Sequence, residues 1–152
     1  MFRGISSAKL DAKGRMALPA RLRGPVDVRC EGKLVITIDM RERCLLLYPL
    51  PEWEIVQRKL ESLPNINPDA RLLQRLLIGH ATDVDLDASA RVLIPPKLRD
   101  FAHLDKSLVL VGQGNKLEIW AEESWNGGMD DWLEQARSTL AAEGDAFTGL
   151  SV

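Results

Sequence analysis

The alternation of apolar and polar positions predicts two matching series of short strands. In the first series a polar segment, DMRER, separates two β-rich runs, which is typical of a hairpin. The second series has the same order of runs and the same kind of hairpin. The first expected strand ends at residues 9–11. The other expected strands cover 15–19, 33–38, 44–49, 81–87, 91–95, 107–112 and 116–120. The pattern therefore indicates an α+β fold built on short strands with flanking helices.

Apolar residues at helical spacing predict the helices. The first long helix is expected to end before Pro64, and a connecting helix begins with Asn67 as cap and Pro68 at its first position. Its leucines share one face, which favours a packed helix over a flexible linker. The expected helical segments are 19–23 as a single turn opened by Pro19, 52–63, 67–79, and 122–140 with an interruption at Gly127 and Gly128.

One fourteen-residue stretch occurs twice. LDAKGRMALPARLR at 10–23 returns as LDASARVLIPPKLR at 86–99, with half of the positions identical. Each unit is too small to bury its apolar face alone, so we expect the two to pair about a pseudo-two-fold axis and interleave into one barrel-like core. The expected divisions are 1–64 for the first repeat, 65–79 for the connecting helix, 80–143 for the second repeat and 144–152 for a flexible tail.

Composition is that of an ordinary globular chain. It has 152 residues, 45% of them apolar and 28% charged, which suits one compact domain. The first eleven residues lack the apolar core of a signal peptide, and no apolar run reaches the length of a membrane span. We therefore expect an intracellular protein with no membrane association. Cys30 and Cys44 have no metal-ligand spacing, and we expect reduced thiols packed as small apolar groups.

Net charge does not announce a nucleic-acid partner, but its distribution is uneven. The net charge is −2, with a pI near 5.7. Residues 1–29 carry seven basic and two acidic side chains, a local charge of +5. A solvated surface would explain charges of this kind equally well. Any positive field that is used must lie near the N-terminus.

The chemistry of the repeat lies in an Asp and an Arg four residues apart across a tight turn. The pairs are Asp11 with Arg15 and Asp87 with Arg91. Arginine can grip a phosphate and read guanine O6 and N7, and an aspartate beside it can fix the guanidinium. One such pair can be merely structural. Its second copy favours a shared function, because a two-fold arrangement places Arg15 and Arg91 on one face with Lys13 nearby.

These residues resemble the MraZ family, whose members are built from two AbrB-like halves. The matching pieces are LDAKGRMALPARLR, CLLLYP, EW, ATDVDLDASARVLIPPKLR, LVLVG and LEIW, in order over roughly residues 1–140. The resemblance implies an internally duplicated, swapped-hairpin β-barrel and a ring-shaped homo-oligomer. It also implies a transcriptional regulator, cytoplasmic and nucleoid-associated, that binds repeated double-stranded sites upstream of the division and cell-wall gene cluster, including its own promoter.

By position, the resemblance implies DNA contact through both loops. The second loop has Ser89 and Ala90 where a KGR or QGR turn is usual in the family, so its turn geometry and its share of DNA contact stay open. We expect no cofactor, no metal and no small-molecule substrate. The expected DNA-binding residues are Asp11, Lys13, Gly14, Arg15, Asp87 and Arg91, with Arg3 and Lys9 from the basic N-terminal segment.

Two other classes of function are the alternatives, and the sequence indicates a protein that is not an enzyme. An enzyme could use Asp11 and Asp87 as an acid pair, or Asp83, Asp85 and Asp87 on one strand face as a cation site. No nucleophile, base or phosphate loop accompanies them, and His80 and His103 each stand alone. A non-catalytic interaction scaffold is the second alternative.

The tryptophans at 53, 120, 125 and 132 follow apolar spacing and are expected to be structural.

Overall fold

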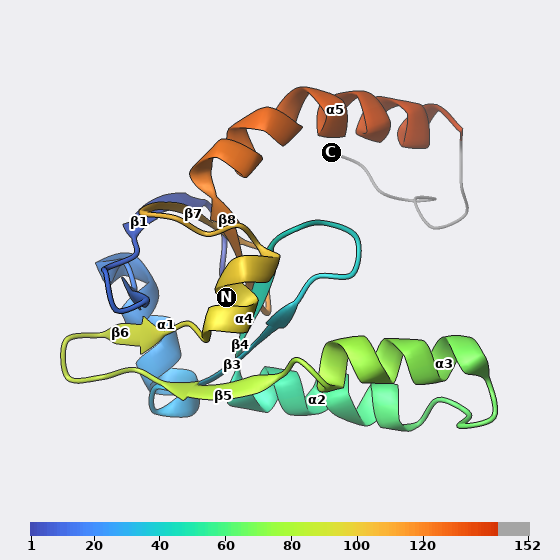
Figure 1. The fold of residues 1–152 in the computed structure, drawn as a ribbon, viewed down its shortest axis with the longest axis horizontal. Helices are drawn as coiled ribbons and strands as arrows, with labels where there is room; N and C mark the ends of the chain where they lie inside the picture. Colours follow the sequence, from blue (N-terminus) through green and yellow to red (C-terminus); the bar gives the residue numbers. More distant parts are fainter. Residues whose placement is uncertain (143–152) are drawn as a thin grey trace. The chain divides into compact units, whose positions relative to one another are not determined.

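The computed structural model describes residues 1–142, apart from the side chain of Arg29, and Figure 1 shows its strands and helices. The strands are β1 (Ile5–Lys9), β2 (Arg15–Ala17), β3 (Lys33–Ile38), β4 (Leu45–Pro49), β5 (Thr82–Asp85), β6 (Arg91–Leu93), β7 (Ser107–Gly112) and β8 (Leu117–Ala121). The helices are α1 (Ala20–Cys30), α2 (Leu50–Glu61), α3 (Pro68–Leu73), the π-helix η1 (Gln74–Ile78), α4 (Pro96–Phe101) and α5 (Glu122–Ala141). The expected α+β class is confirmed.

The two series of strands interleave in one antiparallel sheet. Its order is β1-β7-β8-β4-β3-β5, so β1 leaves its own half to pair with β7 and β5 leaves its own half to pair with β3. The two predicted hairpins, β3–β4 and β7–β8, form the middle of the sheet. Neither half therefore completes its sheet alone.

A second, two-stranded ladder joins the repeated stretches directly. β2 pairs with β6, with Arg15 opposite Leu93, Met16 opposite Val92 and Ala17 opposite Arg91. Arg15 corresponds to Arg91 in the repeat and Leu93 corresponds to Ala17, so one end pair maps onto the other, as a pseudo-two-fold axis requires. The backbone N–H of Leu18 donates to Ala90 and that of Ile94 donates to Gly14, both at 2.9 Å. The ladder thus pairs equivalent segments of the two repeated stretches.

The expected closed β-barrel is wrong. The sheet is open, with β1 and β5 as its edges. β2 and β6 have three residues each and form a separate two-stranded ladder instead of continuing the sheet beyond these edges. Among the described residues, one isolated bridge, Leu10 with Met16, links the ladder to the sheet, and no equivalent bridge joins Leu86 to Val92. Closure therefore fails on the side of the second repeat.

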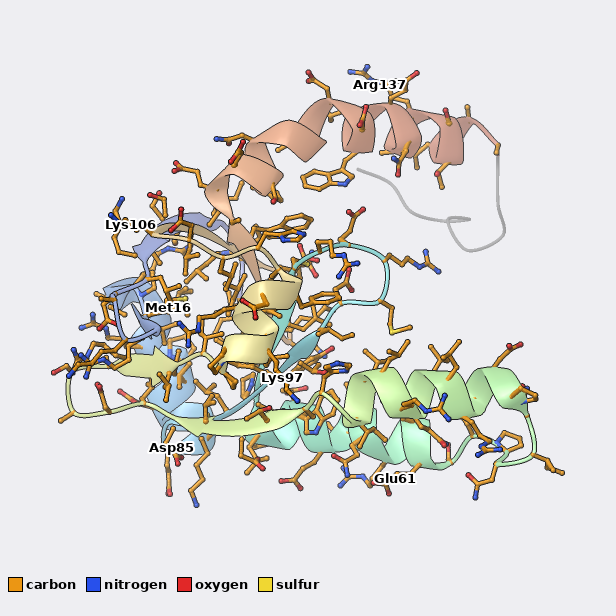
Figure 2. All side chains as sticks on the ribbon, in the orientation of Figure 1. Met16, Glu61, Asp85, Lys97, Lys106 and Arg137 are labelled. Carbon is orange, nitrogen blue, oxygen red and sulfur yellow. The ribbon has the colours of Figure 1, made fainter. Side chains whose placement is uncertain are left out.

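The main core lies between the sheet, the ladder and the short helices after each repeat. Met16, labelled in Figure 2, is fully buried there with its ladder partner Val92. Leu22 of α1 and Leu98 of α4 occupy equivalent positions in the same core. Side chains of the repeat thus pack beneath its loops, and one loop lies at each end of the ladder.

The helix after the first repeat is longer than predicted. Pro19 precedes it with an extended backbone, and α1 runs for 11 residues with Pro25 inside. Pro25 removes one backbone donor, but Leu22, Val26 and Cys30, four residues apart, are all buried. Burial of this face outweighs the local signals for a stop. The expected single turn over 19–23 is therefore wrong.

The helices between the halves follow the sequence closely. The side chain of Asn67 accepts a hydrogen bond from the backbone N–H of Asp69 at 2.9 Å, the cap that the sequence predicts. α3 then continues directly into η1 and lies alongside α2 in Figure 1. The side-chain amide of Gln74 donates to the carbonyl of Leu60 at 2.9 Å and joins the two. The connector is a packed helix.

The C-terminal helix is continuous, contrary to the expected interruption. α5 spans 20 residues, including Gly127 and Gly128, and belongs to a separate structural unit that begins at Glu123. The indole of Trp132 packs over Gly128 and pairs with Trp125, with ring centroids 5.1 Å apart. No helix within 1–142 has both the length and the apolar character to cross a membrane. The flexible tail expected at 144–152 lies outside the described residues.

Candidate nucleic-acid interface

Asp11 organises the whole of the first loop. One carboxylate oxygen accepts from the backbone N–H groups of Lys13 and Arg15, both at 2.9 Å, and the other accepts from Nε of Arg15 at 2.9 Å. The turn closes where the N–H of Gly14 donates to the carbonyl of Asp11, with Gly14 in the left-handed region at φ +84°. Since one aspartate holds both backbone and guanidinium, the orientation of Arg15 is tied to the turn.

The second loop repeats this network despite its different sequence. Asp87 accepts from the N–H of Ser89 at 2.8 Å and from the N–H of Arg91 at 2.9 Å, and its second oxygen accepts from Nε of Arg91 at 3.0 Å. Ala90 takes the place of glycine with φ +56°. The turn geometry left open by the sequence is therefore the same as in the first loop, with a left-handed alanine that costs roughly 1 kcal/mol or more.

Both aspartates are held in their ionised form. The backbone N–H of Arg15, above all, lowers the pKa of Asp11 below its ordinary value. The N–H of Arg91 has the same leading effect on the pKa of Asp87. Both networks therefore persist at neutral pH and weaken only when acid protonates the carboxylates.

Because the ladder is antiparallel, the first loop lies at its Arg15–Leu93 end and the second loop at its Ala17–Arg91 end. Nη1 of Arg91 lies 4.0 Å from the carboxylate of Asp11, so the loops also meet through their charges. The side chains of Arg15 and Arg91 are about one third exposed, at 30% and 33%. With Nε engaged, the terminal nitrogens of each guanidinium are the donors left for a ligand.

The other predicted contact residues divide between near and far. Lys13 is exposed in the first loop, and Gly14 is buried beneath it. Lys9 ends β1 beside this loop, and its ammonium donates to the hydroxyl of Ser107 at 3.0 Å. Arg3 precedes β1 at the opposite end of the strand, so the structure does not bring it to the loops.

Part of the basic N-terminal segment stabilises the fold rather than forming an open field. Arg21 donates to the carbonyl of Arg3 at 2.9 Å and to the hydroxyl of Ser6, which ties α1 to β1. Nε of Arg23 donates to the carbonyl of Leu18 at 2.7 Å. Sequence charge alone did not distinguish these arginines from Arg15.

Sequence reasoning missed Arg99, although it matches Arg23 in the repeat. Its guanidinium lies against the α-carbon of Gly14, where an added β-carbon would stand 2.6 Å from Cζ. A glycine in one repeat opposite an alanine in the other was the available signal. Arg99 belongs to the second half and completes the first loop.

The alternative cation and acid sites find no support in the geometry. Asp87 is engaged by Arg91, and Asp85 lies opposite Lys33 in the sheet. Within the described residues, Asp83, Asp85 and Asp87 do not gather closely enough to share an ion. Nδ1 of His80 lies 2.6 Å from the carbonyl of Leu76, and His103 is exposed, as expected of isolated histidines.

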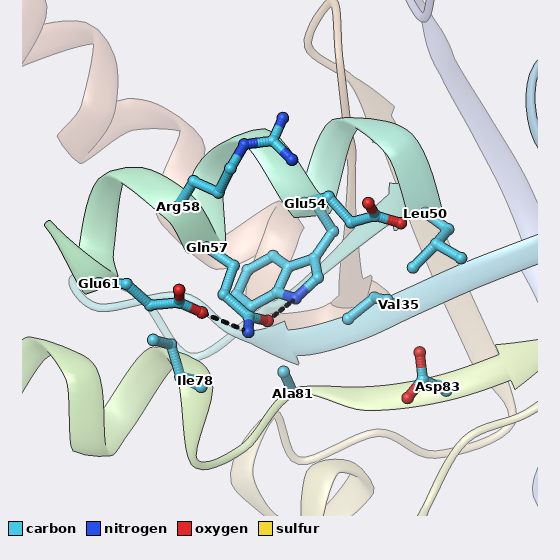
Figure 3. A pocket seen from close by; sticks show the side chains of 10 residues that line it. Val35, Leu50, Glu54, Gln57, Arg58, Glu61, Ile78, Ala81 and Asp83 are labelled. Atoms are coloured by element: carbon cyan, nitrogen blue, oxygen red, sulfur yellow. Dashed lines mark hydrogen bonds between the residues drawn. The ribbon is translucent and has the colours of Figure 1, made fainter.

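Trp53 lies at the base of a groove of about 340 Å³ beside α2 (Figure 3), and its surroundings indicate a structural role. The indole is 3% exposed, and its Nε1 donates to the side chain of Gln57 at 2.9 Å. The amide of Gln57 donates in turn to Glu61 at 2.7 Å. Trp120 is likewise buried, with Nε1 donating to Glu118 at 3.0 Å. Both indoles pack where apolar spacing predicts.

The two cysteines are free and buried, as predicted. The Cys44 thiol lies with the carboxylates of Asp39 and Glu118, their ligand atoms within 4.8 Å of one another. Burial, followed by the charge of Glu118, raises the pKa of Cys44 far above its ordinary value. A thiol that stays protonated is a poor metal ligand, and the Cys44 thiol donates to the carboxylate of Glu118 instead.

The fold and loops define a class: an internally duplicated α+β chain whose halves exchange strands and present two matching Asp-x-x-x-Arg networks, one at each end of the β2–β6 ladder. The family model described as "MraZ protein, putative antitoxin-like" matches residues 1–76 and again 77–146. The chain belongs to the MraZ family.

Similar proteins carry one name. A "Transcriptional regulator MraZ" of Alkalilimnicola ehrlichii is 56% identical over 137 residues, which cover 90% of this chain and 91% of that protein. The protein so named in Thioalkalivibrio sulfidiphilus is 53% identical, with 91% and 92% covered. That of Hydrogenovibrio crunogenus is 50% identical, with 99% and 95% covered. These relatives are named as regulators and not as enzymes.

Proposed function

We propose that this protein is a DNA-binding transcriptional regulator that recognises repeated sites upstream of the division and cell-wall gene cluster, including its own promoter. The observation that carries the proposal is the pair of matching Asp-x-x-x-Arg networks, one at each end of the β2–β6 ladder, with Arg91 of the second 4.0 Å from Asp11 of the first. The names of the relatives support the regulatory role.

The loops suit DNA because each arginine is oriented by its aspartate through Nε and keeps its terminal nitrogens for a ligand. Asp11 holds Nε of Arg15, and Asp87 holds Nε of Arg91, which leaves the terminal nitrogens as a fork for phosphate or for guanine O6 and N7. Lys13 adds an exposed ammonium for the backbone of the nucleic acid. Each carboxylate turned toward its own arginine is partly neutralised, which limits repulsion of phosphate.

A ring of subunits completes the proposal. One chain offers two short loops, whereas linked loops on neighbouring subunits can raise avidity by about 10² to 10⁴. The exchange of β1 and β5 between the halves supports the swapped-hairpin arrangement implied by the family resemblance. A cytoplasmic, nucleoid-associated location follows from the proposed partner.

A gel shift with DNA from upstream of the protein's own gene tests the function. We expect a complex that weakens steeply between low and moderate salt, because phosphate contacts release counterions. Several direct repeats should bind more tightly than one at the same fragment length. No complex at either salt concentration would favour the alternative, a non-catalytic interaction scaffold, over DNA binding.

A further inference from the structure

Arg99 and Arg23 occupy matching positions in the repeat but have different surroundings. Nε of Arg23 donates to the carbonyl of Leu18 at 2.7 Å, and the N–H of Leu18 donates to Ala90 in the second loop. Nε of Arg99 is buried and has no hydrogen-bond partner within the described part of the chain. A buried donor of this kind is rare in folded proteins and calls for an explanation.

The methyl group of Ala90 accounts for the difference. At the first loop, Gly14 leaves the equivalent space empty, and the guanidinium of Arg99 fills it. A β-carbon on Gly14 would meet Cζ at 2.6 Å, Nη1 at 2.7 Å and Nε at 2.9 Å. Arg99 thus lies flat on the turn that carries Lys13 and Arg15, whereas Arg23 is held by a main-chain acceptor.

The side chain of Arg99 also lines an open groove next to the first loop. The groove includes Lys9, Asp11 and Ala12 from the first half and Lys106 from the second. Asp100 and Asp105 line it too, so it is not a uniformly positive channel. An anion would be held there by direct hydrogen bonds to a guanidinium rather than by a broad field.

We infer that Arg99 is a further DNA-contact residue, which donates to a backbone phosphate of the nucleic acid held by the first loop. The contact uses the terminal nitrogens of the guanidinium, since Nε is buried, and this Nε is not held by a main-chain carbonyl as that of Arg23 is. Arg23 has no such freedom, so the second loop lacks an equivalent contact. The inference rests on the proposed function and adds the other half of the chain to the first loop.

Substitution of the two matched arginines tests the contact. Binding of wild type, Arg99→Gln and Arg23→Gln to upstream DNA and to a scrambled fragment is measured over a series of salt concentrations. Arg99→Gln should reduce the slope of log K against log[salt] by about 1 for each engaged subunit, equally on both DNAs, since phosphate contacts carry no sequence information. Arg23→Gln should keep the wild-type slope and lower the thermal midpoint instead.

Arg99→Lys separates charge from packing, because it keeps a cation but cannot cover Gly14 with a planar group; it should retain the wild-type slope. An unchanged slope in Arg99→Gln, with wild type binding normally, would overturn the inference while the proposed function stands. A slope lost equally in Arg99→Gln and Arg23→Gln would overturn it as well. Absence of salt-dependent binding by wild type would overturn both.

Discussion

One methyl group distinguishes the turns of the two loops. Gly14 and Ala90 both adopt left-handed backbone, but only glycine does so without strain. Gly14 also makes room for Arg99, which Ala90 cannot do for Arg23. The sequence was sufficient to predict each Asp–Arg pair, because both partners lie within one turn. It did not reveal Arg99, because that contact joins residues far apart in the chain.

Replacement of Ala90 by glycine and of Gly14 by alanine should change the free energy of unfolding in opposite directions. Ala90→Gly relieves left-handed strain and should raise the free energy of unfolding by up to about 1 kcal/mol. Gly14→Ala should lower it by more, since its β-carbon must also displace the Arg99 guanidinium. Urea unfolding of both variants measures the changes. A stabilised Gly14→Ala protein would show that the space above this turn is not limiting.

The two arginines should contribute unequally to DNA binding. Arg15 has Lys13, Gly14 and Arg99 beside it, whereas Arg91 follows β5, whose Asp83 and Asp85 repel phosphate. Arg15→Ala should cost about 1 to 3 kcal/mol of binding free energy per engaged subunit, and Arg91→Ala less. Titration of both variants on one promoter fragment decides the order. An equal or larger loss in Arg91→Ala would reverse this ranking.

At the scale of elements, periodic signals predicted the structure well and local breakers did not. The hairpins β3–β4 and β7–β8 and the Asn67 cap appear where the sequence predicts them. The sequence suggested a single helical turn over 19–23 and an interruption at Gly127 and Gly128, yet α1 extends to Cys30 and α5 is continuous. In α1 the buried face decides the outcome. Tertiary packing of this kind is not visible in a short window of sequence.

The adjacent glycines of α5 provide a matched pair. Nothing lies within 4 Å of a β-carbon on Gly127, whereas one on Gly128 would meet the Trp132 indole at 2.4 Å. Gly127→Ala should therefore stabilise the helix by roughly 0.5 to 1 kcal/mol. Gly128→Ala should disturb the Trp125–Trp132 pair and gain less or nothing. Thermal unfolding by circular dichroism, with indole fluorescence, compares them; equal gains would mean that the indole does not depend on Gly128.

For the molecule as a whole, the halves depend on each other. The duplication predicted the interleaving, because neither repeat can cover its own apolar face, but it did not predict the open sheet. The alternation pattern suggested five-residue strands at β2 and β6, whereas each has three residues and the two form a separate ladder. Each half supplies an edge strand to the other's hairpin, so unfolding of the Met1–Glu122 unit should be cooperative.

The buried Cys44 thiol should make the free energy of unfolding of this unit fall at alkaline pH. The Cys44 thiol ionises near pH 9.0 when unfolded and far higher when folded, so its contribution is full below pH 9 and lost as pH rises above it. Above pH 9, one such thiol lowers the free energy of unfolding by about 1.4 kcal/mol for each pH unit. Cys44→Ala should make the decline in unfolding free energy between about pH 9.5 and 10.5 shallower by that amount. A decline as steep as that of wild type would contradict the burial effect.

The most direct test of the account is DNA binding by the double variant Arg15→Ala/Arg91→Ala, with Arg71→Ala as the control. Arg71 is an exposed arginine on α3, far in the sequence from both loops, so its loss changes charge without touching the Asp–Arg networks. Fluorescence anisotropy on upstream DNA, with sedimentation to compare assembly, gives affinity and oligomeric state together. We predict that the double variant assembles like wild type but loses specific binding, while Arg71→Ala binds nearly as wild type does. A double variant that assembles and binds the same DNA with wild-type affinity would contradict the central claim that these loops are the DNA-binding surface.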